Sequence, residues 1–225
     1  MKISILTLFP EMFQGPFDYS IIKNASEKKK VDINFINIRD FGIGRHRVVD
    51  DKPYGGGHGM ILRVDVLEKA ISNTKGKKLT TKDQKIILLS PHGKTFNQKK
   101  AVQLSHLRHL ILICGRYEGV DERIKGFIDE ELSIGDFIVT GGEIPAMLVA
   151  DAVTRLIKGV LKEGVTDTES FSPLLEYPQY TKPDDYKNLK VPTILLGGNH
   201  GKIKLWRDEI SLKTTKILRP DLLKK

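Results

Sequence analysis

The stretch Ser133–Leu161, "SIGDFIVTGGEIPAMLVADAVTRLIKGVL", carries the strongest fold signal in the sequence. A short apolar run, "DFIVT", ends in two adjacent glycines, and an acid and a proline then open a segment with helical periodicity. Pro145 suits the first turn of a helix, where its missing N–H would be unpaired in any case, and Gly159 suits the helix end. The periodic apolar positions are Ile144, Met147, Leu148, Ala152, Leu156 and Ile157. We therefore predict a strand, a glycine turn and a helix that ends near Gly159.

The same alternation of strand and helix extends toward the N-terminus. Apolar, β-branched runs recur as "ISILTLF", "VDINFINI", "KIILLS" and "LILICG", with helix-like segments such as "NQKKAVQLSHLRHL" among them, where Asn97 suits the N-cap. This order predicts crossover units on a parallel sheet, and therefore an α/β fold. Three runs end in the turns "LLSPHG", "ICGRYEG" and "IVTGGE". Because ligands bind at the carboxyl ends of parallel strands, these turns are expected to converge on one pocket.

Composition restricts the class of protein and its partner. With 225 residues and 40% hydrophobic content, the chain can form one large core, or a larger domain with a smaller one. Lysine and arginine number 37 against 28 acids, a net charge of +9 that favours nucleic acid as a polyanionic partner. The single cysteine fits a reducing compartment. No apolar run reaches spanning length, and Pro10 interrupts the first one too early for a signal peptide, so we expect a cytoplasmic protein with no membrane partner.

The chain is expected to divide unevenly. The segment "KEGVTDTESFSPLLEYPQYTKPDDY" holds three prolines and many polar residues without periodicity, which is typical of a linker or a functional loop. We predict an α/β domain over 1–161, a flexible interdomain linker over 162–176 and a small helical domain over 177–225. "GNHGKIKLWRDEISLKTTKIL" should be a basic helical region in the last of these.

Several chemistries lack the residues that they need. The glycine-rich "TGGE" and "YGGGHGM" have neither the GxxxxGK[ST] nor the GxGxxG spacing, so a phosphate-binding loop or dinucleotide site is weakly supported. His106 and His109 have helical spacing, but no cysteine or acid joins them, and no metal site is expected. Cys114 ends an apolar run and is interpreted as a buried small residue rather than a nucleophile. Covalent catalysis therefore has no candidate.

Two acids and one arginine are candidates for catalytic residues, although each also has a plain structural explanation. Asp167 and Glu169 lie in "TDTESF", a segment without core character, although acids in loops are commonly just solvated. Arg155 lies on the predicted helix, where a simple ion pair with Asp151 four residues earlier is an alternative to a role in catalysis.

Several motifs of the sequence resemble those of one known family. "HRVVDDKPYGGGHGM", "SPHGKTFNQ", "ICGRYEGVDERI", the opening stretch, "LLEYPQYTKP" and "GNHGKIKLWR" run in family order along almost the whole chain. They resemble the bacterial tRNA (guanine-N1)-methyltransferases, which belong to the knotted SPOUT class of methyltransferases. "GRYEGVDER" together with "SIGDFIVTGGE" is the most specific part.

The resemblance implies a fold and a reaction. The α/β domain is expected to hold a deep trefoil knot in its C-terminal part, an exception to the rule that chains do not thread loops. A small helical domain should follow, and two chains should form a homodimer with active sites between subunits. The cofactor would be S-adenosyl-L-methionine, bound in the knot cleft. Its methyl group would go to N1 of the guanine immediately 3′ of a tRNA anticodon.

The resemblance also implies roles for individual residues. Guanine N1 carries a proton at neutral pH, so a base must remove it. The family has an aspartate directly before "SF", where this sequence has Glu169; Glu169 is therefore expected to be the base, with Asp167 as the fallback. Arg155 matches the catalytic arginine and would stabilise negative charge on guanine O6. Glu118 matches an acid near the methionine end of the cofactor, where Mg²⁺ has been implicated.

Two sets of binding residues follow from the same motifs. The expected cofactor-binding residues are Leu89, Ser90, Pro91, Gly115, Tyr117, Glu118, Gly119, Ser133, Ile134, Gly135, Asp136, Phe137, Ile138, Val139, Gly141, Gly142 and Pro145. The expected tRNA-binding residues are Tyr54, Gly55, Gly56, Gly57, Ser170, Asn199, His200, Lys202, Lys204 and Arg207. His58 replaces a proline of the family pattern and Leu88 replaces an aromatic residue; both changes are expected to alter cofactor contacts without changing the reaction.

Two other functions remain open. A catalytically inert RNA-binding protein would explain the charge, and it would bind the cofactor without transferring a methyl group. A related knotted RNA methyltransferase with another target would share the glycine turns. It should lack "ESFSPLLEYPQYTKP" and the C-terminal domain.

Overall fold

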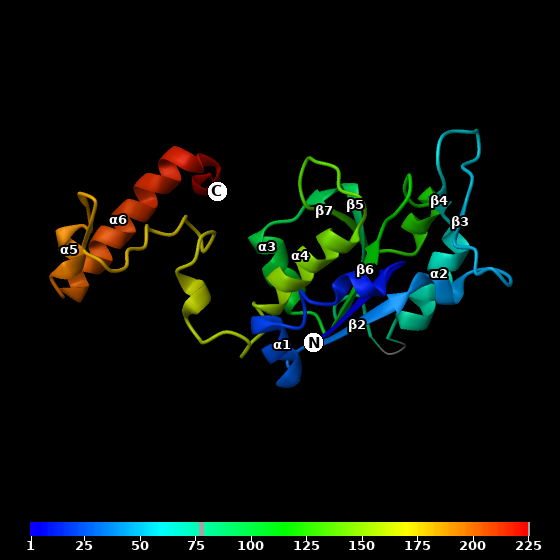
Figure 1. The fold of residues 1–225 in the computed structure, drawn as a ribbon, viewed down its shortest axis with the longest axis horizontal. Helices are drawn as coiled ribbons and strands as arrows, with labels where there is room; N and C mark the ends of the chain where they lie inside the picture. Colours follow the sequence, from blue (N-terminus) through cyan, green and yellow to red (C-terminus); the bar gives the residue numbers. More distant parts are fainter. Residues whose placement is uncertain (77–78, 225) are drawn as a thin grey trace. The chain divides into compact units, whose positions relative to one another are not determined.

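The computed structural model describes residues 1–76 and 79–224. Two compact units make up the chain, Met1–Leu161 and Lys162–Lys225. Figure 1 colours the first from blue to yellow-green and the second from yellow to red. Each unit has helices and strands of its own.

The first unit is built on a parallel sheet of five strands in the order β2-β1-β6-β5-β7. The strands are β1 (Lys2–Thr7), β2 (Asp32–Asn37), β5 (Gln84–Thr95), β6 (His109–Cys114) and β7 (Glu130–Ser133). All the neighbouring pairs are parallel; Leu112 of β6, for example, lies between Ile5 and Ile87. The predicted α/β class with a parallel sheet is confirmed.

Helices cover both faces of this sheet (Figure 1). Successive side chains of a strand point to opposite faces. Leu110 and Leu112 of β6 join a core with α1 (Ser20–Glu27), α3 (Gln98–Ser105) and α4 (Glu143–Thr154). Ile111 and Ile113 join a second core with α2 (Val64–Thr74). Strands buried on both faces need continuous apolar runs, which is why "LILIC" shows no alternation.

Short elements complete the first unit. Three turns of 3-10 helix are η1 (Pro10–Phe13), η2 (Ile38–Phe41) and η3 (Glu122–Gly126). A small antiparallel pair, β3 (Asp50–Asp51) with β4 (Ile61–Leu62), carries the glycine-rich loop between its strands. The predicted N-cap of α3 is confirmed, because the Asn97 side chain accepts a hydrogen bond from the Lys100 N–H at 2.9 Å.

The strand predicted over "DFIVT" is wrong. The edge strand is β7, which pairs with β5 only as far as Ser133. Gly135 follows at a φ of +143°, a conformation that ends an extended strand. Phe137 and Ile138 then lie in a loop and are 57% and 82% exposed. The strand β5 is itself irregular beside β7, with a register shift between Leu89 and Lys94.

The helix α4 is present, but its end and its buried face differ from the prediction. It ends at Thr154, and Gly159 lies beyond it in a turn with a φ of +80°. Of the predicted stripe, Ile144 and Leu148 are 51% and 44% exposed. The buried face is made instead of smaller residues, namely Pro145, Ala146, Val149, Ala150 and Val153. Small side chains let the helix lie close to the strands beneath it.

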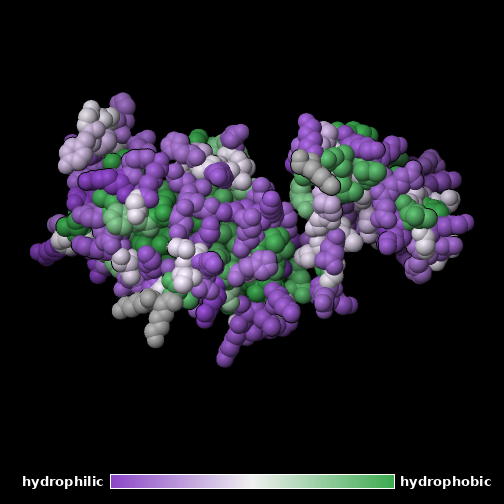
Figure 2. Space-filling model, turned by 180° about the vertical axis from the view of Figure 1, so that it is seen from behind, coloured by the Kyte–Doolittle hydropathy of each residue, from purple (hydrophilic) through white to green (hydrophobic). Residues whose placement is uncertain are grey.

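The second unit is mainly helical. It contains η4 (Val165–Asp167), the hairpin of β8 (Asp185–Tyr186) and β9 (Leu189–Lys190), α5 (Thr193–Leu196), α6 (His200–Leu218) and η5 (Pro220–Leu223). The predicted basic helix is therefore confirmed as α6. Hydrophobic groups remain on the surface of this unit (Figure 2), among them Leu205 and Ile217, which are 71% and 68% exposed.

Residues that the sequence assigns to the interdomain linker pack within this second unit. The Leu175 N–H donates to the hydroxyl of Thr215 on α6 at 2.9 Å, and Thr215 is fully buried. The guanidinium of Arg219 lies 5.4 Å from the ring centre of Phe171. The part of the segment that follows η4 is thus attached to α6.

Within residues 1–76 and 79–224, none of the helices combines the length and the apolar character needed to cross a bilayer.

Candidate active site

A cavity of about 430 Å³ lies where β5, β6 and β7 end. Its walls come from the irregular part of β5 and from the loops that follow β6 and β7. The three turns expected to converge therefore form one pocket. The predicted cofactor-binding residues that line it are Leu89, Ser90, Pro91, Gly115, Tyr117, Glu118, Gly119, Ser133, Ile134, Gly135, Phe137, Ile138, Val139, Gly141, Gly142 and Pro145. Leu88, which departs from the family pattern, also lines it.

Asp136 is the exception among the predicted wall residues. The Phe137 N–H donates to the Gly135 carbonyl at 3.0 Å, which makes Asp136 the middle residue of a three-residue turn. Its side chain is exposed to solvent and lies outside the cavity wall. Asp136 therefore does not line the cavity, and its expected contact with the cofactor stays a prediction.

Adjacent glycines let the loop after β7 return to the end of β6. The Gly142 N–H donates to the Gly115 carbonyl at 2.9 Å. A Cβ on Gly142 would lie 2.5 Å from the Cα of Cys114, and one on Gly141 would lie 2.3 Å from Nε of Arg116. Both distances are shorter than real Cβ contacts allow. The two glycines therefore do allow a close backbone approach. At both positions the neighbour is another part of the same chain, Arg116 or Cys114.

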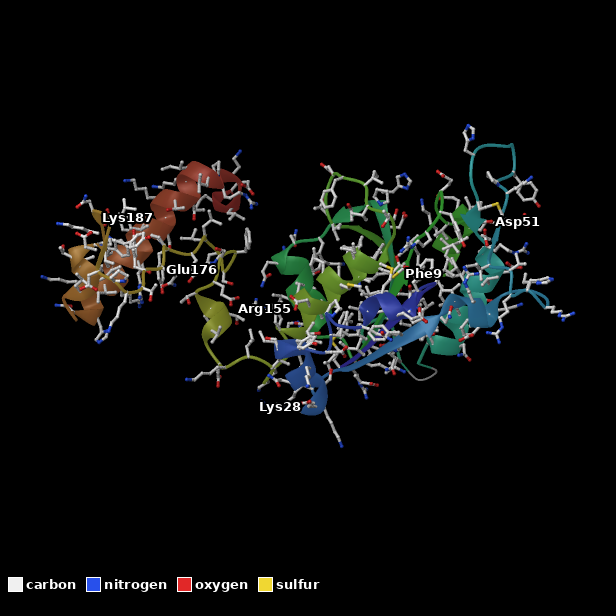
Figure 3. All side chains as sticks on the ribbon, in the orientation of Figure 1. Phe9, Lys28, Asp51, Arg155, Glu176 and Lys187 are labelled. Carbon is white, nitrogen blue, oxygen red and sulfur yellow. The ribbon has the colours of Figure 1, made fainter. Side chains whose placement is uncertain are left out.

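A buried ion pair fixes the turn that opens α4. The Glu143 side chain is 1% exposed, and its carboxylate accepts from Arg116 Nε at 2.9 Å and from the Thr7 hydroxyl at 2.8 Å. Arg116 also donates to the Thr140 carbonyl at 3.1 Å, and its guanidinium lies 4.7 Å from the ring centre of Phe9, labelled in Figure 3. The first turn of a helix favours a negative charge. The pair thus ties β1, the loop after β6 and α4 together.

Sequence reasoning missed both partners of this pair. Glu143 could have been suspected, since an acid in the first turn of an apolar helix is a recognised signal. Arg116 offered no such signal, because the two residues lie 27 positions apart.

Glu118 differs from the other charged residues of the cavity. Lys125 pairs with Glu131 at 3.4 Å and also with Glu122, and Arg116 pairs with Glu143. Across residues 1–76 and 79–224, no ion pair involves Glu118. Its carboxylate therefore remains available for a positively charged ligand.

The glycine-rich loop between β3 and β4 lies against this acid. The Glu118 N–H donates to the Met60 carbonyl at 3.0 Å, and the Leu62 N–H donates to the Gly119 carbonyl at 3.0 Å. A Cβ on Gly59 would lie 2.5 Å from Cγ of Glu118. The C-terminal end of the loop that carries Tyr54 thus lies beside the cavity.

Cys114 lies under the cavity floor as an inert residue. It is fully buried, and burial together with the nearby negative charge of Glu143 raises the pKa of its thiol well above the usual range. A thiol of this kind is protonated at neutral pH and is a poor nucleophile. The interpretation of Cys114 as a buried small residue is confirmed.

Comparison with known proteins identifies the family. A family model described as tRNA (Guanine-1)-methyltransferase TrmD matches residues 1–225. The chain belongs to this family. A Dictyoglomus turgidum protein named tRNA (guanine-N(1)-)-methyltransferase is 55% identical over 229 residues, covering 100% of this chain and 91% of its own. Proteins of the same name from Carboxydothermus hydrogenoformans and Bacillus subtilis are 56% and 51% identical over 227 residues, covering 100% of this chain and 88% and 93% of theirs.

Membership in the tRNA (guanine-1)-methyltransferase family confirms the resemblance drawn from the motifs, and with it the expectation that the chain is an enzyme. The residues predicted to be catalytic for such a methyltransferase fall in both units. Arg155 follows α4 directly, is half-buried, and donates its N–H to the Asp151 carbonyl at 3.1 Å; Figure 3 labels it. Asp167 and Glu169 belong to the second unit.

The two candidate bases of the methyltransferase differ in their surroundings. Asp167 ends η4 and is exposed. Glu169 is half-buried and begins a turn in which its carbonyl accepts the Ser172 N–H at 3.1 Å. The Ser170 hydroxyl accepts the Glu176 N–H at 3.0 Å and closes the same loop. The backbone of Asp167 is also held, since its N–H donates to the Gly164 carbonyl at 3.3 Å, so the two acids differ mainly in their exposure.

The residues predicted to bind tRNA have mixed positions. Tyr54 is 99% exposed, and Gly55, Gly56 and Gly57 beside it all have positive φ values, between 82° and 133°. Asn199 caps α6 by accepting the Lys202 N–H at 3.1 Å. In the first turns of α6, His200, Lys202 and Lys204 are exposed to solvent.

Arg207 stands apart from the other basic residues of α6. Its guanidinium lies 4.5 Å from the ring centre of Tyr177, and its Nε is buried without a hydrogen-bond partner among the described residues. This stacking gives Arg207 a structural role within its own unit, in addition to the role in RNA binding that its motif predicts.

Proposed function

We propose that this protein transfers the methyl group of S-adenosyl-L-methionine to N1 of the guanine immediately 3′ of the anticodon in tRNA. The single observation that carries the proposal is the cavity where β5, β6 and β7 end, whose walls contain almost every residue that the family motifs assign to the cofactor. Family membership over residues 1–225 supplies the reaction class. The charge of +9 suits an RNA substrate.

The cavity suits the proposed cofactor in size and polarity. A volume of about 430 Å³ lies within the range of small-molecule sites. Aliphatic side chains such as Leu89, Ile138 and Pro145 line it together with glycine backbone, which offers N–H and C=O groups to a flat base. The unpaired carboxylate of Glu118 suits the positive charge that the methionine part carries. Ser90, Tyr117 and Gly141 would contact the remaining parts of the cofactor.

Magnesium is a weaker expectation. Mg²⁺ prefers several oxygen ligands and commonly keeps water molecules. In the part of the chain that the structure describes, no group of three or more His, Cys, Asp or Glu side chains comes together. Glu118 would supply one oxygen to an ion that is otherwise bound by water, cofactor or RNA.

The catalytic groups of the chain act on the guanine. The bound cofactor supplies a methyl group that is already activated, so no side-chain nucleophile is needed. The Glu169 carboxylate would accept the N1 proton, which would leave an electron pair on N1 free to take up the methyl group. The Arg155 guanidinium stabilises the negative charge that develops on O6. Orientation of the two reactants provides the remaining acceleration.

The finer topology of the family is part of this proposal. The chain leaves the edge strand β7, passes the end of β5 and reaches Gly115 at the end of β6, where Gly142 is hydrogen-bonded. A return path of this kind is what a trefoil knot at the C-terminal end of the sheet requires. We include that knot in the proposal.

A homodimer with active sites between subunits is also proposed. Apolar side chains that a single chain leaves exposed support it, namely Phe9, Met12, Phe137, Ile144 and Leu148, all 38% exposed or more. In such a dimer, each active site would take residues from both subunits. The proposed compartment is the cytoplasm, where tRNA is available.

The target base of the RNA must leave the base stack of the anticodon loop to reach a methyl donor. This requirement suits recognition of an unpaired loop. The segment around Glu169 would order over the bound tRNA. Lys202 and Lys204 on α6 would contact the RNA backbone.

The test separates catalysis from binding. Transfer of labelled methyl to a tRNA transcript is measured with guanine, and then adenine, 3′ of the anticodon, and cofactor binding is measured by calorimetry. Transfer to the guanine transcript alone supports the proposal. Binding of cofactor and tRNA without transfer would establish the inert RNA-binding alternative, and equal transfer to both transcripts would point to a different target.

A further inference from the structure

A second hollow, of about 880 Å³, lies at the opposite end of the strands from the proposed cofactor cavity. It is formed where β1, β2 and β6 begin, near the N-terminus and α1 in Figure 1. Backbone hydrogen bonds hold its walls together: the Lys2 N–H donates to the Arg108 carbonyl at 2.8 Å, and the Asp32 N–H donates to the Met1 carbonyl at 2.9 Å. All of its lining residues belong to the first unit.

The hollow has an apolar floor and a basic rim. Val31 and Leu107 of its lining are buried, at 3% and 8% exposure. The exposed side chains of Lys2, Lys29, Arg108 and Lys158 line it, whereas Asp32 is its one acidic lining residue among those described. The chain's amino group adds a further positive charge and donates to the Lys30 carbonyl at 2.9 Å.

One carboxylate, that of Asp32, faces these four cations, so the described lining keeps a net positive charge. Over residues 1–76 and 79–224, the ion pairs found include none with Lys2, Lys29, Arg108 or Lys158. The Lys2 charge contributes, after burial, to lowering the pKa of the neighbouring His109. Like charges gathered in one hollow repel one another, and an anionic partner would relieve that repulsion.

We propose that this basic hollow, the surface lined by Lys2, Lys29, Arg108 and Lys158, binds the phosphodiester backbone of the tRNA substrate at a distance from the methylated guanine. The inference rests on the proposed function, because it takes the substrate to be tRNA. A six-residue strand spans about 20 Å, so the hollow and the cofactor cavity are separated by roughly that length of sheet. A folded RNA can therefore reach both ends of the strands.

The backbone is favoured over a base as the occupant. Four flexible cationic side chains around an open hollow suit phosphates, which lie at regular intervals along the RNA. The buried lining residues Val31 and Leu107 are aliphatic, and the one ring in the described lining, His106, is exposed to solvent, so the floor offers no stacking surface for a base. The contact would add affinity for tRNA without reading its sequence.

The experiment compares two variants that lose the same charge. The test variant carries Lys29→Gln, Arg108→Gln and Lys158→Gln. The control variant carries Lys23→Gln, Lys69→Gln and Lys99→Gln, three exposed lysines on α1, α2 and α3 that do not line the hollow. Binding of a tRNA transcript is measured over a series of KCl concentrations, together with binding of S-adenosyl-L-methionine and methyl transfer at saturating tRNA.

The test variant should bind tRNA at least tenfold more weakly than the control. The fall of its log affinity with log salt concentration should be less steep by about 2 to 3 in slope. Each lost phosphate contact removes roughly 0.7–0.9 from the magnitude of that slope. Cofactor affinity and the rate at saturating tRNA should stay at the wild-type values. Equal tRNA binding and equal salt slopes in the two variants would overturn the inference while wild-type methyl transfer upholds the proposed function. A wild-type protein that neither binds nor methylates tRNA would overturn both.

Discussion

The N–H of Gly142 donates a hydrogen bond to the carbonyl of Gly115 at 2.9 Å, and this contact leaves no room for a side chain on Gly142. The two loops that it joins form facing parts of the cavity wall. We predict that Gly142→Ala lowers the affinity for S-adenosyl-L-methionine more than tenfold and destabilises the protein by about 1–3 kcal/mol, since a methyl group 2.5 Å from the Cα of Cys114 forces the backbone apart. Calorimetric titration and urea unfolding measure the two effects.

Gly126→Ala is the matched control for that substitution. A Cβ on Gly126 would meet no atom within 4 Å, and the φ of Gly126 is not positive. This variant should keep the wild-type cofactor affinity. If Gly142→Ala also bound the cofactor like the wild type, the close approach would not shape the site.

The buried pair of Glu143 and Arg116 should be important for stability. Glu143→Gln is expected to lower the free energy of unfolding by about 3 kcal/mol, because it leaves the Arg116 guanidinium, 18% exposed, without its carboxylate. Urea unfolding measures this loss. As a control, Arg123→Gln breaks the pair with Asp121, in which the arginine side chain is 69% exposed. An unfolding midpoint near that of the wild type is expected for Arg123→Gln. Equal midpoints for Glu143→Gln and wild type would contradict the account.

His109 should make stability fall in mild acid. Burial, together with the charge of Lys2, lowers the pKa of His109 from 6.5 to about 4. Its ring lies between the Ser4 hydroxyl at 2.9 Å and Oε1 of Gln84 at 3.0 Å. In the unfolded chain the His109 ring takes up a proton below pH 6.5, whereas in the folded protein it does so only near pH 4. The contribution of neutral His109 to the free energy of unfolding is therefore complete above pH 6.5 and is lost as the pH falls toward 4.

The size of this effect can be isolated by substitution. Between pH 7.5 and pH 5, His109 should account for about 2 kcal/mol of the loss in unfolding free energy. His109→Gln should remove that part of the pH dependence, whereas His106→Gln, at an exposed position, should keep it. Urea unfolding at the two pH values decides, and identical pH profiles for all three proteins would refute the assignment.

The proposed base can be tested by conservative exchange. Glu169→Gln keeps the shape but cannot accept a proton, and it should lower the rate of methyl transfer by about 10²–10⁴. Glu169→Asp restores the aspartate of the family pattern and should stay within roughly tenfold of the wild type. Asp167→Asn serves as the control and should remain close to wild-type rates. Single-turnover transfer at saturating tRNA is the measurement; a larger loss in Asp167→Asn than in Glu169→Gln would move the role of base to Asp167.

Much of the sheet could be predicted because its strands are buried on both faces. Runs such as "LILIC" in β6 are continuously apolar for that reason, and the crossover order then gives a parallel sheet. The edge strand β7 was missed because "EELS" looks polar. Its Glu130 is paired with Lys85 at 3.5 Å and with Lys100, partners that lie far away in the sequence.

The helix α4 shows a second limit of sequence patterns. Large apolar residues such as Ile144 and Leu148 outweigh alanines in any hydrophobic periodicity, yet the structure buries Ala146 and Ala150 instead. Close packing on the sheet selects small side chains, which a pattern of hydrophobicity does not register. The cavity residues were found through family motifs, whereas the pair of Arg116 and Glu143 required the three-dimensional structure.

The position of the methyl group on the tRNA product can be mapped by primer extension. A methyl group on N1 blocks the base-pairing edge of guanine, so reverse transcriptase stops at that nucleotide. After reaction of the wild-type protein with S-adenosyl-L-methionine and a tRNA transcript, we predict one new stop, at the guanine 3′ of the anticodon. Full-length extension of a tRNA that has nevertheless acquired labelled methyl, or a stop at another position, would contradict the account.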